Sequence, residues 1–214
     1  MNADDAVSHY TQLAAETRLQ RGADEPRWLE ERRASALASF TAGGFPTRKQ
    51  EGWRYTSLDK LLTQTFATPR EPAYRISQKS ISSLRTTDAE AVRLVFCDGH
   101  LVEPLSDINN LPDGIQISSL RDRLTSPSKQ VSEQLDRLFE NDYEGFDYIN
   151  TTLAKDGLWL EVEANVSLER PIEVIHTSQQ RDMGLLLVPR NLVILHPGAQ
   201  ATLIEHYSSP PGST

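Results

Sequence analysis

The chain of 214 residues is poor in cysteine, in long apolar runs and in positive charge. Its one cysteine, Cys97, rules out an intramolecular disulfide and any metal site built from thiolates of this chain alone. Uninterrupted apolar runs reach only four residues, as at 185–188, whereas a membrane-spanning helix needs about 20. Lys and Arg number 22 against 30 Asp and Glu, a formal net charge of −8. Nucleic acid is therefore not an expected partner, because phosphate binding requires a concentrated basic surface.

The first ten residues, MNADDAVSHY, are acidic and have neither a basic segment nor an apolar core, so they do not have the pattern of a secretory signal. We therefore expect a cytoplasmic location and no membrane contact. With 38% hydrophobic residues, the chain can bury the core of one large domain or of two smaller ones.

Two helices are expected at the N-terminus. Apolar residues recur at helical spacing through residues 3–21, which predicts an amphipathic helix that Gly22 ends. A second helix is expected to begin at Asp24-Glu25-Pro26, with an acidic cap and proline in its first turn, and to stop at the Gly-Gly pair 43–44.

Residues 45–62, FPTRKQEGWRYTSLDKLL, concentrate unusual residues in a loop that leads into a short helix. Thr56 and Ser57 stand where an N-cap would precede the leucines of that helix. The aromatic rings of this loop can stack against guanidinium groups. The segment is locally positive in an acidic chain, with Arg48, Lys49, Arg54 and Lys60 against Glu51 and Asp59.

This loop supplies the candidate site, and two interpretations of it stay open. In the first, the aromatic residues fill a hole between helices and Arg54 pairs with Glu51 or Asp59, so the loop is a structural anchor. In the second, the arginines are exposed and form a docking patch for an anion or a partner protein. No catalytic residue is assigned. The candidate residues are Arg48, Glu51, Trp53, Arg54 and Tyr55.

The next segments predict a linker and then a β-hairpin. Residues 63–89 are rich in Thr, Ser, Pro and Gln with little periodicity, which indicates a surface crossing or linker. Alternation over residues 92–97, followed by Asp98-Gly99, is typical of a hairpin. Cys97 lies in the first strand of this hairpin, and we interpret it as a small buried hydrophobe rather than a nucleophile.

A strand at 115–120, a helix after Pro127 and a short helix at about 146–154 are expected next. An acidic run accompanies these helices. It is interpreted as a solvated face, with a docking surface for a basic partner as the alternative. The run comprises Glu133, Asp136, Glu140, Asp142, Glu144 and Asp147.

After Gly157 the pattern becomes that of β-structure. Four aliphatic segments, LWLEVE, PIEVIH, LLLVPRNLVIL and ATLIEHY, are separated by Asn, Ser, Gly and Pro. Their short spacing suits a sandwich, a cupin-like barrel or the first turns of a β-solenoid, and periodicity does not choose among these.

The same region contains His176, His196, Glu205 and His206, a set of residue types that could bind a metal ion. Their spacing is unfavourable, because Glu205 and His206 are adjacent and so lie on opposite faces of a strand. No metal ligand is assigned, and a cupin-like metal-dependent enzyme built on these residues is the rival hypothesis. The chain has no Walker-type phosphate loop, so it is not expected to hydrolyse ATP.

The order of motifs resembles the SufB/SufD family, the non-ATPase scaffold subunits of the SUF iron–sulfur cluster assembly machinery, and its SufD branch in particular. The resemblance spans about residues 45–207 and is weak over 63–90. It rests on the hairpin RLVFCDG and on a tandem of separated motifs. These motifs are Pro46, Arg48, Glu51 and the run WRYT, then Asn150, Asp156-Gly157, Arg170-Pro171-Ile172, Pro189-Arg190-Asn191-Leu192 and Ile204-Glu205-His206-Tyr207.

The resemblance implies an α+β fold in which an N-terminal helical and mixed region is followed by the start of a right-handed parallel β-helix. Family members are considerably longer, so the β-helix would be cut short here. The expected regions are a helical region at 1–65, a mixed α/β region at 66–155 and the first β-helix strands at 156–214.

The resemblance also implies a scaffold and not an enzyme, with a SufB-like subunit and a SufC-like ATPase as partners. No cofactor is expected in this chain, since the iron–sulfur cluster and ATP would belong to the complex. A β-helix that stops after a few strands leaves an open edge, so a homodimer through the strands after Leu158 is also expected. A β-solenoid interaction module without any role in iron–sulfur chemistry is a third hypothesis.

Overall fold

The computed structural model describes residues 3–21, 25–69, 76–86, 90–125, 129–135, 137–139, 144–179 and 184–208. The chain forms two compact units, each made of two segments. Met1–Thr68 and Leu124–Ala154 form the first, here called the helical unit, and Pro69–Arg123 and Lys155–Thr214 form the second, called the sheet unit. The residues 66–155, expected as one mixed region, are therefore divided between the two units.

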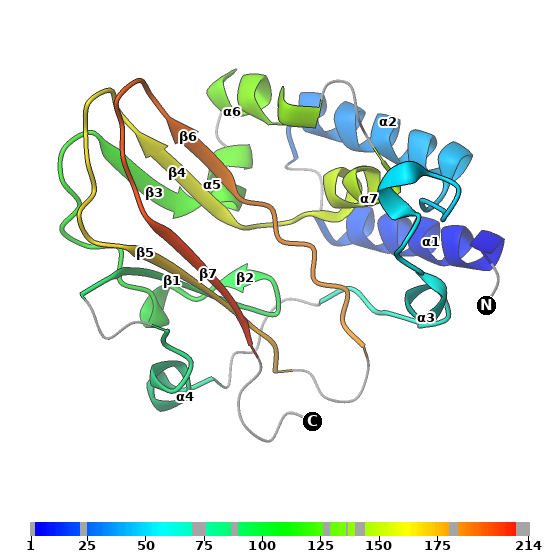
Figure 1. The fold of residues 1–214 in the computed structure, drawn as a ribbon, viewed down its shortest axis with the longest axis horizontal. Coiled ribbons are helices and arrows are strands. Elements are labelled where there is room, and N and C mark those ends of the chain that lie inside the picture. The colour runs from blue at the N-terminus through cyan, green and yellow to red at the C-terminus, as the bar shows by residue number, and fades with distance from the viewer. Residues whose placement is uncertain are drawn as a thin grey trace. The chain divides into compact units, whose positions relative to one another are not determined.

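In the described part of the helical unit there are three helices of nine or more residues, and α2 packs against the other two. The two N-terminal helices are confirmed, although Gly22 and Asp24 lie outside the described residues. The expectation of proline in the first turn of the second helix was wrong, because Pro26 is the N-cap of α2 and Arg27 its first residue. The α-helices are α1 (Ala3–Arg21), α2 (Arg27–Gly43), α3 (Asp59–Leu62), α6 (Lys129–Gln134) and α7 (Gly145–Leu153), and the 3₁₀ turns are η1 (Glu51–Trp53) and η3 (Arg137–Phe139) (Figure 1).

Aromatic rings fill the centre of the helical unit. The Phe45 ring lies 4.9 Å from that of Tyr10 and 5.0 Å from that of Phe40, both in edge-to-face geometry. Tyr10 and Phe40 come from the apolar faces of α1 and α2 and are almost fully buried. Burial of each such ring stabilises the fold by about 2 to 3 kcal/mol, so this cluster is a main contribution to the packing of α1 against α2.

Two arginines fix the C-terminal end of α7. The buried Arg33 donates from Nη1 to the carbonyl of Thr151 at 2.9 Å, and Arg21 donates to the carbonyl of Thr152 at 2.6 Å. These carbonyls belong to the last turn of the helix, where no intrahelical donor remains and the helix dipole is negative. Burial, together with the neighbouring Arg33, lowers the pKa of Arg21 to about 9, and Glu25 opposes this shift.

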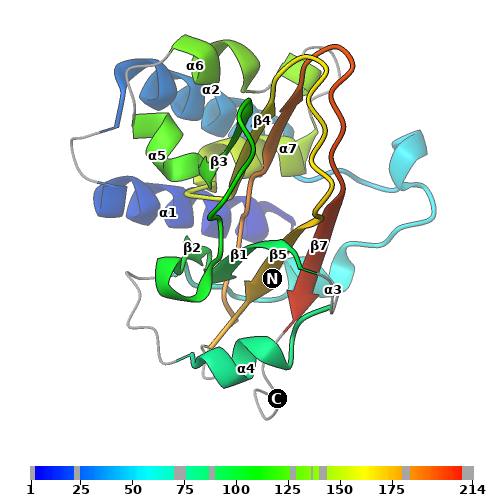
Figure 2. The ribbon, with the colours of Figure 1, turned by 90° about the vertical axis from the view of Figure 1, so that its left-hand side faces the viewer.

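The sheet unit contains seven strands in the described ranges, in two open sheets with strand orders β2-β1-β5-β7 and β3-β4-β6 (Figure 2). The strands are β1 (Val92–Cys97), β2 (His100–Leu101), β3 (Ile115–Ser119), β4 (Leu158–Val162), β5 (Ile172–Thr177), β6 (Leu192–Leu195) and β7 (Leu203–Ser208). Short helical segments accompany them: α4 (Gln78–Ser82), η2 (Glu103–Leu105) and α5 (Leu120–Thr125).

The β-hairpin expected from the sequence is confirmed. Strands β1 and β2 pair antiparallel, and the two turn residues, Asp98 and Gly99, have φ values of 49° and 80°. Two consecutive positive φ values are what a tight two-residue hairpin needs, and Asp and Gly adopt them readily. Cys97 is buried as predicted, and burial, with Asp98 beside it, raises the pKa of its thiol to about 12.

From β4 onward the chain alternates between the two sheets. Strand β6 pairs parallel with β4, and β7 pairs parallel with β5, so the second passage of the chain lies along the first. The connections are stacked as well, because Ser167 forms a parallel bridge to Gln200 and the Leu168 amide donates to the Gln200 carbonyl at 2.9 Å. Residues 158–177 and 192–208 are therefore two successive, superposed turns of chain.

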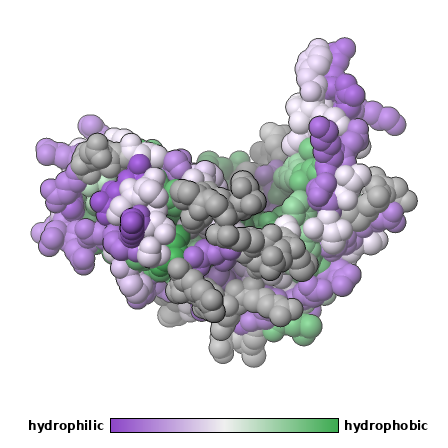
Figure 3. Space-filling model, turned by 90° about the horizontal axis from the view of Figure 1, so that it is seen from below, coloured by the Kyte–Doolittle hydropathy of each residue, from purple (hydrophilic) through white to green (hydrophobic). Residues whose placement is uncertain are grey.

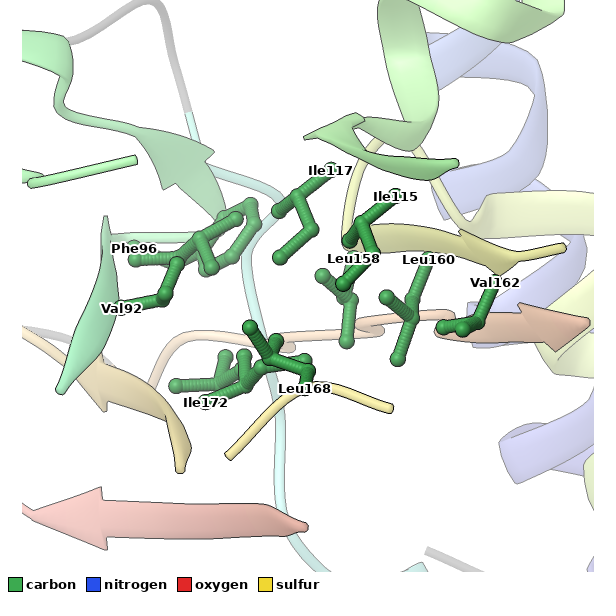
Figure 4. Close-up of a cluster of buried hydrophobic side chains, with 11 residues drawn as sticks. Val92, Phe96, Ile115, Ile117, Leu158, Leu160, Val162, Leu168 and Ile172 are labelled. Carbon is green, nitrogen blue, oxygen red and sulfur yellow. The ribbon is translucent and has the colours of Figure 1, made fainter. Parts of the chain in front are cut away.

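The main core lies between the two sheets (Figure 4). Every second residue of β1, β3, β4 and β5 points into it, as the alternation of side chains along a strand requires. Leu158, Leu160 and Val162 of β4 face Val92 and Ile172 of the other sheet, and all five are at most 1% exposed.

Helix α4 packs on part of the outer face of the sheet β2-β1-β5-β7 (Figures 1 and 2). Ile81 and Leu84 are buried there against Val95 and Ile175, so the prediction of a surface crossing or linker over residues 63–89 was wrong for this part. The error has a physical cause: a helix of five residues is too short to show a period in sequence.

A buried ion pair lies on the same outer face. Arg93 donates from Nε to Glu173 at 2.6 Å, and Thr86 donates to the other oxygen of that carboxylate from its amide and its hydroxyl. Burial opposes ionisation of Glu173, but these donors outweigh it and hold the pKa of the carboxyl below its usual value. The pair ties the segment after α4 to the sheet.

The mixed α+β class, with helices followed by sheets, is confirmed, and the described strands close no barrel. None of the helices in the described ranges combines the length and apolar character that a membrane crossing requires. On the face drawn in Figure 3, hydrophilic residues cover most of the coloured surface and apolar residues form smaller patches.

Candidate interaction surfaces

The loop at residues 46–57 is fastened to the helical unit by Trp53. Its ring stacks on that of Phe146, with 5.3 Å between centroids, and its Nε1 donates to the carboxylate of Glu144. Glu144 is the N-cap of α7 and forms a capping box with Asp147, whose Oδ2 accepts from the Glu144 amide at 2.9 Å. The tryptophan therefore joins the loop to the start of a well-capped helix.

Three neighbouring side chains of the loop are exposed, and we call Arg48, Arg54 and Tyr55 the cationic patch. Arg48 donates from Nε to the carbonyl of Arg54 at 3.3 Å, so its side chain lies across the backbone of that residue. The guanidinium carbon of Arg54 lies 5.5 Å from the centroid of the Tyr55 ring, which is 86% exposed. The three side chains thus form one contiguous group.

The remaining candidate, Glu51, is also exposed and reaches Arg54 only at 3.9 Å. An exposed ion pair of this kind contributes little to stability. The structure therefore divides the candidate site: Trp53 is the anchor of the first interpretation, whereas the arginines and Tyr55 have the exposure that the second requires. The expected N-cap of α3 was wrong, because Leu58 occupies that position, although Ser57 Oγ accepts from the Asp59 amide at 3.2 Å.

A second surface is the uncovered end of the sheet unit. Val193 and Leu195 of β6 pair in register with the buried Leu160 and Val162, and Leu203 of β7 pairs with the buried Ile172. These positions face the core between the sheets, yet Val193, Leu195 and Leu203 are 41%, 49% and 38% exposed. The core thus continues into the last turn of chain and is not covered there. We call these three residues and Tyr207 the open end.

An aromatic ladder reaches the same end. Phe96, His176 and Tyr207 are paired in register on β1, β5 and β7, with ring centroids 5.1 Å and then 4.6 Å apart. Their exposure rises along the ladder from 1% to 6% and then to 63%. The Tyr207 ring is therefore exposed, whereas the two rings with which it is aligned, those of Phe96 and His176, are buried.

A polar cluster lies beside the ladder. The Oε1 atom of Glu205 accepts from Asn191 Nδ2 at 2.8 Å and from the Tyr207 hydroxyl at 2.5 Å, and lies 3.2 Å from His176 Nε2. Burial lowers the pKa of His176 although Glu205 opposes the shift, and burial together with Glu205 raises the pKa of Tyr207. The cluster is therefore a neutral imidazole and a phenol around one carboxylate.

The four residues of the metal hypothesis are only partly brought together. His176 meets Glu205, but His196 Nε2 lies 2.9 Å from Glu161 instead, and His206 is paired in register with Ile175, on the outer face. Within the described ranges, no three His, Cys, Asp or Glu side chains gather as a metal site.

Sequence reasoning missed the role of Asp156, which organises the entry into β4. This buried carboxylate accepts hydrogen bonds from the Ser119 hydroxyl at 2.6 Å and from the amides of Gly157, Arg121 and Leu101 at 2.8, 3.2 and 3.3 Å. It thereby joins the hairpin, the end of β3 and the start of β4.

Gly157 and Asn191 secure the next step. A Cβ on Gly157 would collide with the carbonyl oxygen of Arg190, so only glycine fits there. Asn191 accepts from the Leu158 amide through Oδ1 at 2.8 Å and donates to Glu205 through Nδ2. Asp156, Gly157 and Asn191 all belong to motifs that were singled out in the sequence. The Asp-Gly pair after an expected helix was the sequence signal for the start of β4.

Comparison with known proteins identifies the class. The family model described as the SufBD protein N-terminal region matches residues 4–174, so the chain belongs to the SufBD family. The chain is 30% identical to the iron–sulfur cluster assembly protein SufD of Escherichia coli K12 over 175 residues, which cover 81% of the chain and 38% of that protein. It is 25% identical to an iron–sulfur cluster assembly SufBD family protein of Synechocystis sp. over 164 residues, 77% of the chain and 36% of that protein. The chain thus spans less than two fifths of the length of either relative.

Proposed function

We propose that this chain acts as a SufD-like scaffold in iron–sulfur cluster assembly, through contacts with a SufB-like subunit and a SufC-like ATPase in the cytoplasm. Family membership and the names of the two relatives support the assembly role. In this proposal the chain has no catalytic residue. The cluster is the cargo of the complex, and ATP is hydrolysed by the partner ATPase.

We further propose that the two superposed turns of chain begin a right-handed parallel β-helix. The support is the alternation of β4, β5, β6 and β7 between two sheets, with parallel pairing of each strand to the strand one turn later. In such a stack each turn is stabilised by its neighbours, so a turn without a neighbour leaves apolar surface exposed.

The observation that carries the scaffold proposal is the open end. Inward-facing Val193, Leu195 and Leu203 are exposed although their partners in the preceding turn are buried, so another layer of polypeptide is required to complete the core. In a longer protein a further turn of the same chain would supply that layer. In the 214-residue chain, a second copy that stacks through β6 and β7 would take its place and form a homodimer.

Complex formation tests the scaffold role directly. The protein, expressed at the full length that its gene encodes, is mixed with the purified SufB-like and SufC-like proteins of the same organism and analysed by size-exclusion chromatography with light scattering. The proposal predicts one species that contains all three proteins. Separate elution of this protein at all concentrations would contradict it and would favour an interaction module outside cluster assembly.

A further inference from the structure

The cationic patch differs from an ordinary set of surface arginines because its backbone is held in place. Trp53, two residues before Tyr55, is stacked on Phe146 and hydrogen-bonded to Glu144, and the Arg48 side chain is hydrogen-bonded to the backbone of Arg54. Within the described ranges Arg48 forms no ion pair, and Arg54 forms only an exposed one, with Glu51 at 3.9 Å. Two guanidinium groups and an aromatic face thus lie side by side and are exposed.

The local charge is opposite to that of the whole chain. Residues 46–60 contain four cations, Arg48, Lys49, Arg54 and Lys60, against two anions, Glu51 and Asp59, a local charge of +2 where the chain carries −8. Glu144, at the start of α7, accepts from Trp53 and from its own helix cap. Residues 46–60 are therefore a locally positive segment of an acidic chain.

We propose that the cationic patch is a docking site for an acidic segment of a partner protein. Guanidinium groups bind carboxylates through two parallel hydrogen bonds, and the exposed Tyr55 ring adds a flat surface for the aliphatic part of a glutamate or for a neighbouring apolar side chain. A short segment with two or three carboxylates is sufficient to match the two guanidinium groups. A long polyanion such as nucleic acid is disfavoured, because the net charge of the rest of the chain repels it.

This inference rests on the proposed scaffold role and deepens it, because it names the chemistry of one partner contact. It involves the helical unit alone and does not depend on the open end. A peptide assay without the assembly partners therefore distinguishes failure of this inference from failure of the scaffold proposal.

The test is fluorescence anisotropy with a fluorescein-labelled peptide that contains six glutamates, against a control peptide in which glutamines replace them. The 214-residue chain is compared with the double variant Arg48→Ala/Arg54→Ala and with Arg27→Ala as the matched control. Arg27 is a 90% exposed arginine on α2 of the same unit. We expect the double variant to weaken glutamate-peptide binding about tenfold, the control variant to leave it unchanged, and added salt to weaken it further.

Arg54→Lys sharpens the test, because it keeps the charge and removes the planar fork, and we expect it to weaken binding by a smaller factor than Arg54→Ala. No binding of the glutamate peptide, equal binding of the glutamine peptide, or an equal loss in Arg27→Ala would each overturn the proposal. Tighter binding of a single-stranded oligonucleotide of equal charge would also overturn it. Thermal unfolding of each variant shows whether the helical unit stays folded.

Discussion

The cores of the two units use aromatic side chains in opposite ways. In the helical unit, Tyr10, Phe40 and Phe45 surround one another, and each is at most 8% exposed. In the sheet unit the ladder that begins at the buried Phe96 ends at Tyr207, which is 63% exposed. Helices of one unit can pack their apolar faces against one another. The last strands of a parallel stack, in contrast, leave an apolar face without a neighbouring strand. Among the described residues, the aromatic core of the helical unit is therefore closed, whereas the core of the sheet unit is exposed at β6 and β7.

Removal of an aromatic ring is expected to give the largest difference in stability between the two units. Phe40→Ala creates a cavity in a closed core and should lower the free energy of unfolding by about 3 to 5 kcal/mol. Tyr207→Ala removes an exposed ring and should lower it by less than about 1 kcal/mol. Urea denaturation of both variants measures the difference. Equal losses would show that the open end is already covered.

A buried charge gives the next largest effect. Glu173→Gln leaves Arg93 buried without its counter-ion and should lower the free energy of unfolding by about 3 kcal/mol at pH 7. Because the donors from Thr86 and Arg93 keep the pKa of Glu173 lowered, its contribution is complete above its unfolded-state pKa of about 4.3 and is lost as the pH falls below that value. The free energy of unfolding of Glu173→Gln should therefore fall less than that of the wild type between pH 7 and pH 3. Urea denaturation of wild type and variant between pH 7 and pH 3 checks both statements.

Within the loop at residues 46–57, the anchor Trp53 can be compared with Tyr55 of the cationic patch. Trp53→Phe keeps most of the ring and loses the hydrogen bond to Glu144, which should lower the free energy of unfolding by about 1 to 2 kcal/mol. Tyr55→Ala should change it by less than about 0.5 kcal/mol. If thermal unfolding showed the reverse order, the assignment of Trp53 as anchor would be wrong.

Replacement of the buried His100 should change the free energy of unfolding least at neutral pH. Within the described ranges, both ring nitrogens of His100 are buried without a hydrogen-bond partner. Burial, then Lys155, lower its pKa, while Asp156 and Asp98 oppose the shift and Arg121 adds to it. The unfolded chain then binds the proton more readily, so stability should fall as the pH drops below about 6.5, by at most about 1.4 kcal/mol per pH unit. His100→Leu should reduce this slope. An unchanged slope between pH 7 and pH 5 would assign it to other groups, of which His176 is the first candidate.

Much of the fold could be predicted from the sequence because its signals are local. The hairpin at Asp98-Gly99 and the helix at residues 3–21 follow from turn chemistry and apolar spacing, and both are confirmed. The stacking of β6 on β4 was not predictable from periodicity, since the partners are 33 residues apart and the same aliphatic segments suit a sandwich or a barrel. The buried role of Asp156 was missed for the same reason, because its donors come from three separate segments.

The candidate site was predictable in composition and not in orientation. The sequence singled out five residues between Arg48 and Tyr55, yet the direction of the Trp53 side chain depends on Phe146 and Glu144, about 90 residues further along the chain. The open end was expected only in outline. Which residues form it depends on the register of β6 against β4 and of β7 against β5, and a shift of one residue would have turned Leu195 to the other face.

Sedimentation velocity of the 214-residue chain at tens of micromolar tests the open end most directly. The account predicts reversible self-association that is lost in Val193→Ser/Leu195→Ser, because serine removes the apolar surface without a change in the buried partners Leu160 and Val162. A wild-type chain that sediments only as a monomer would contradict the account, since the uncovered core of the sheet unit would then need no further layer.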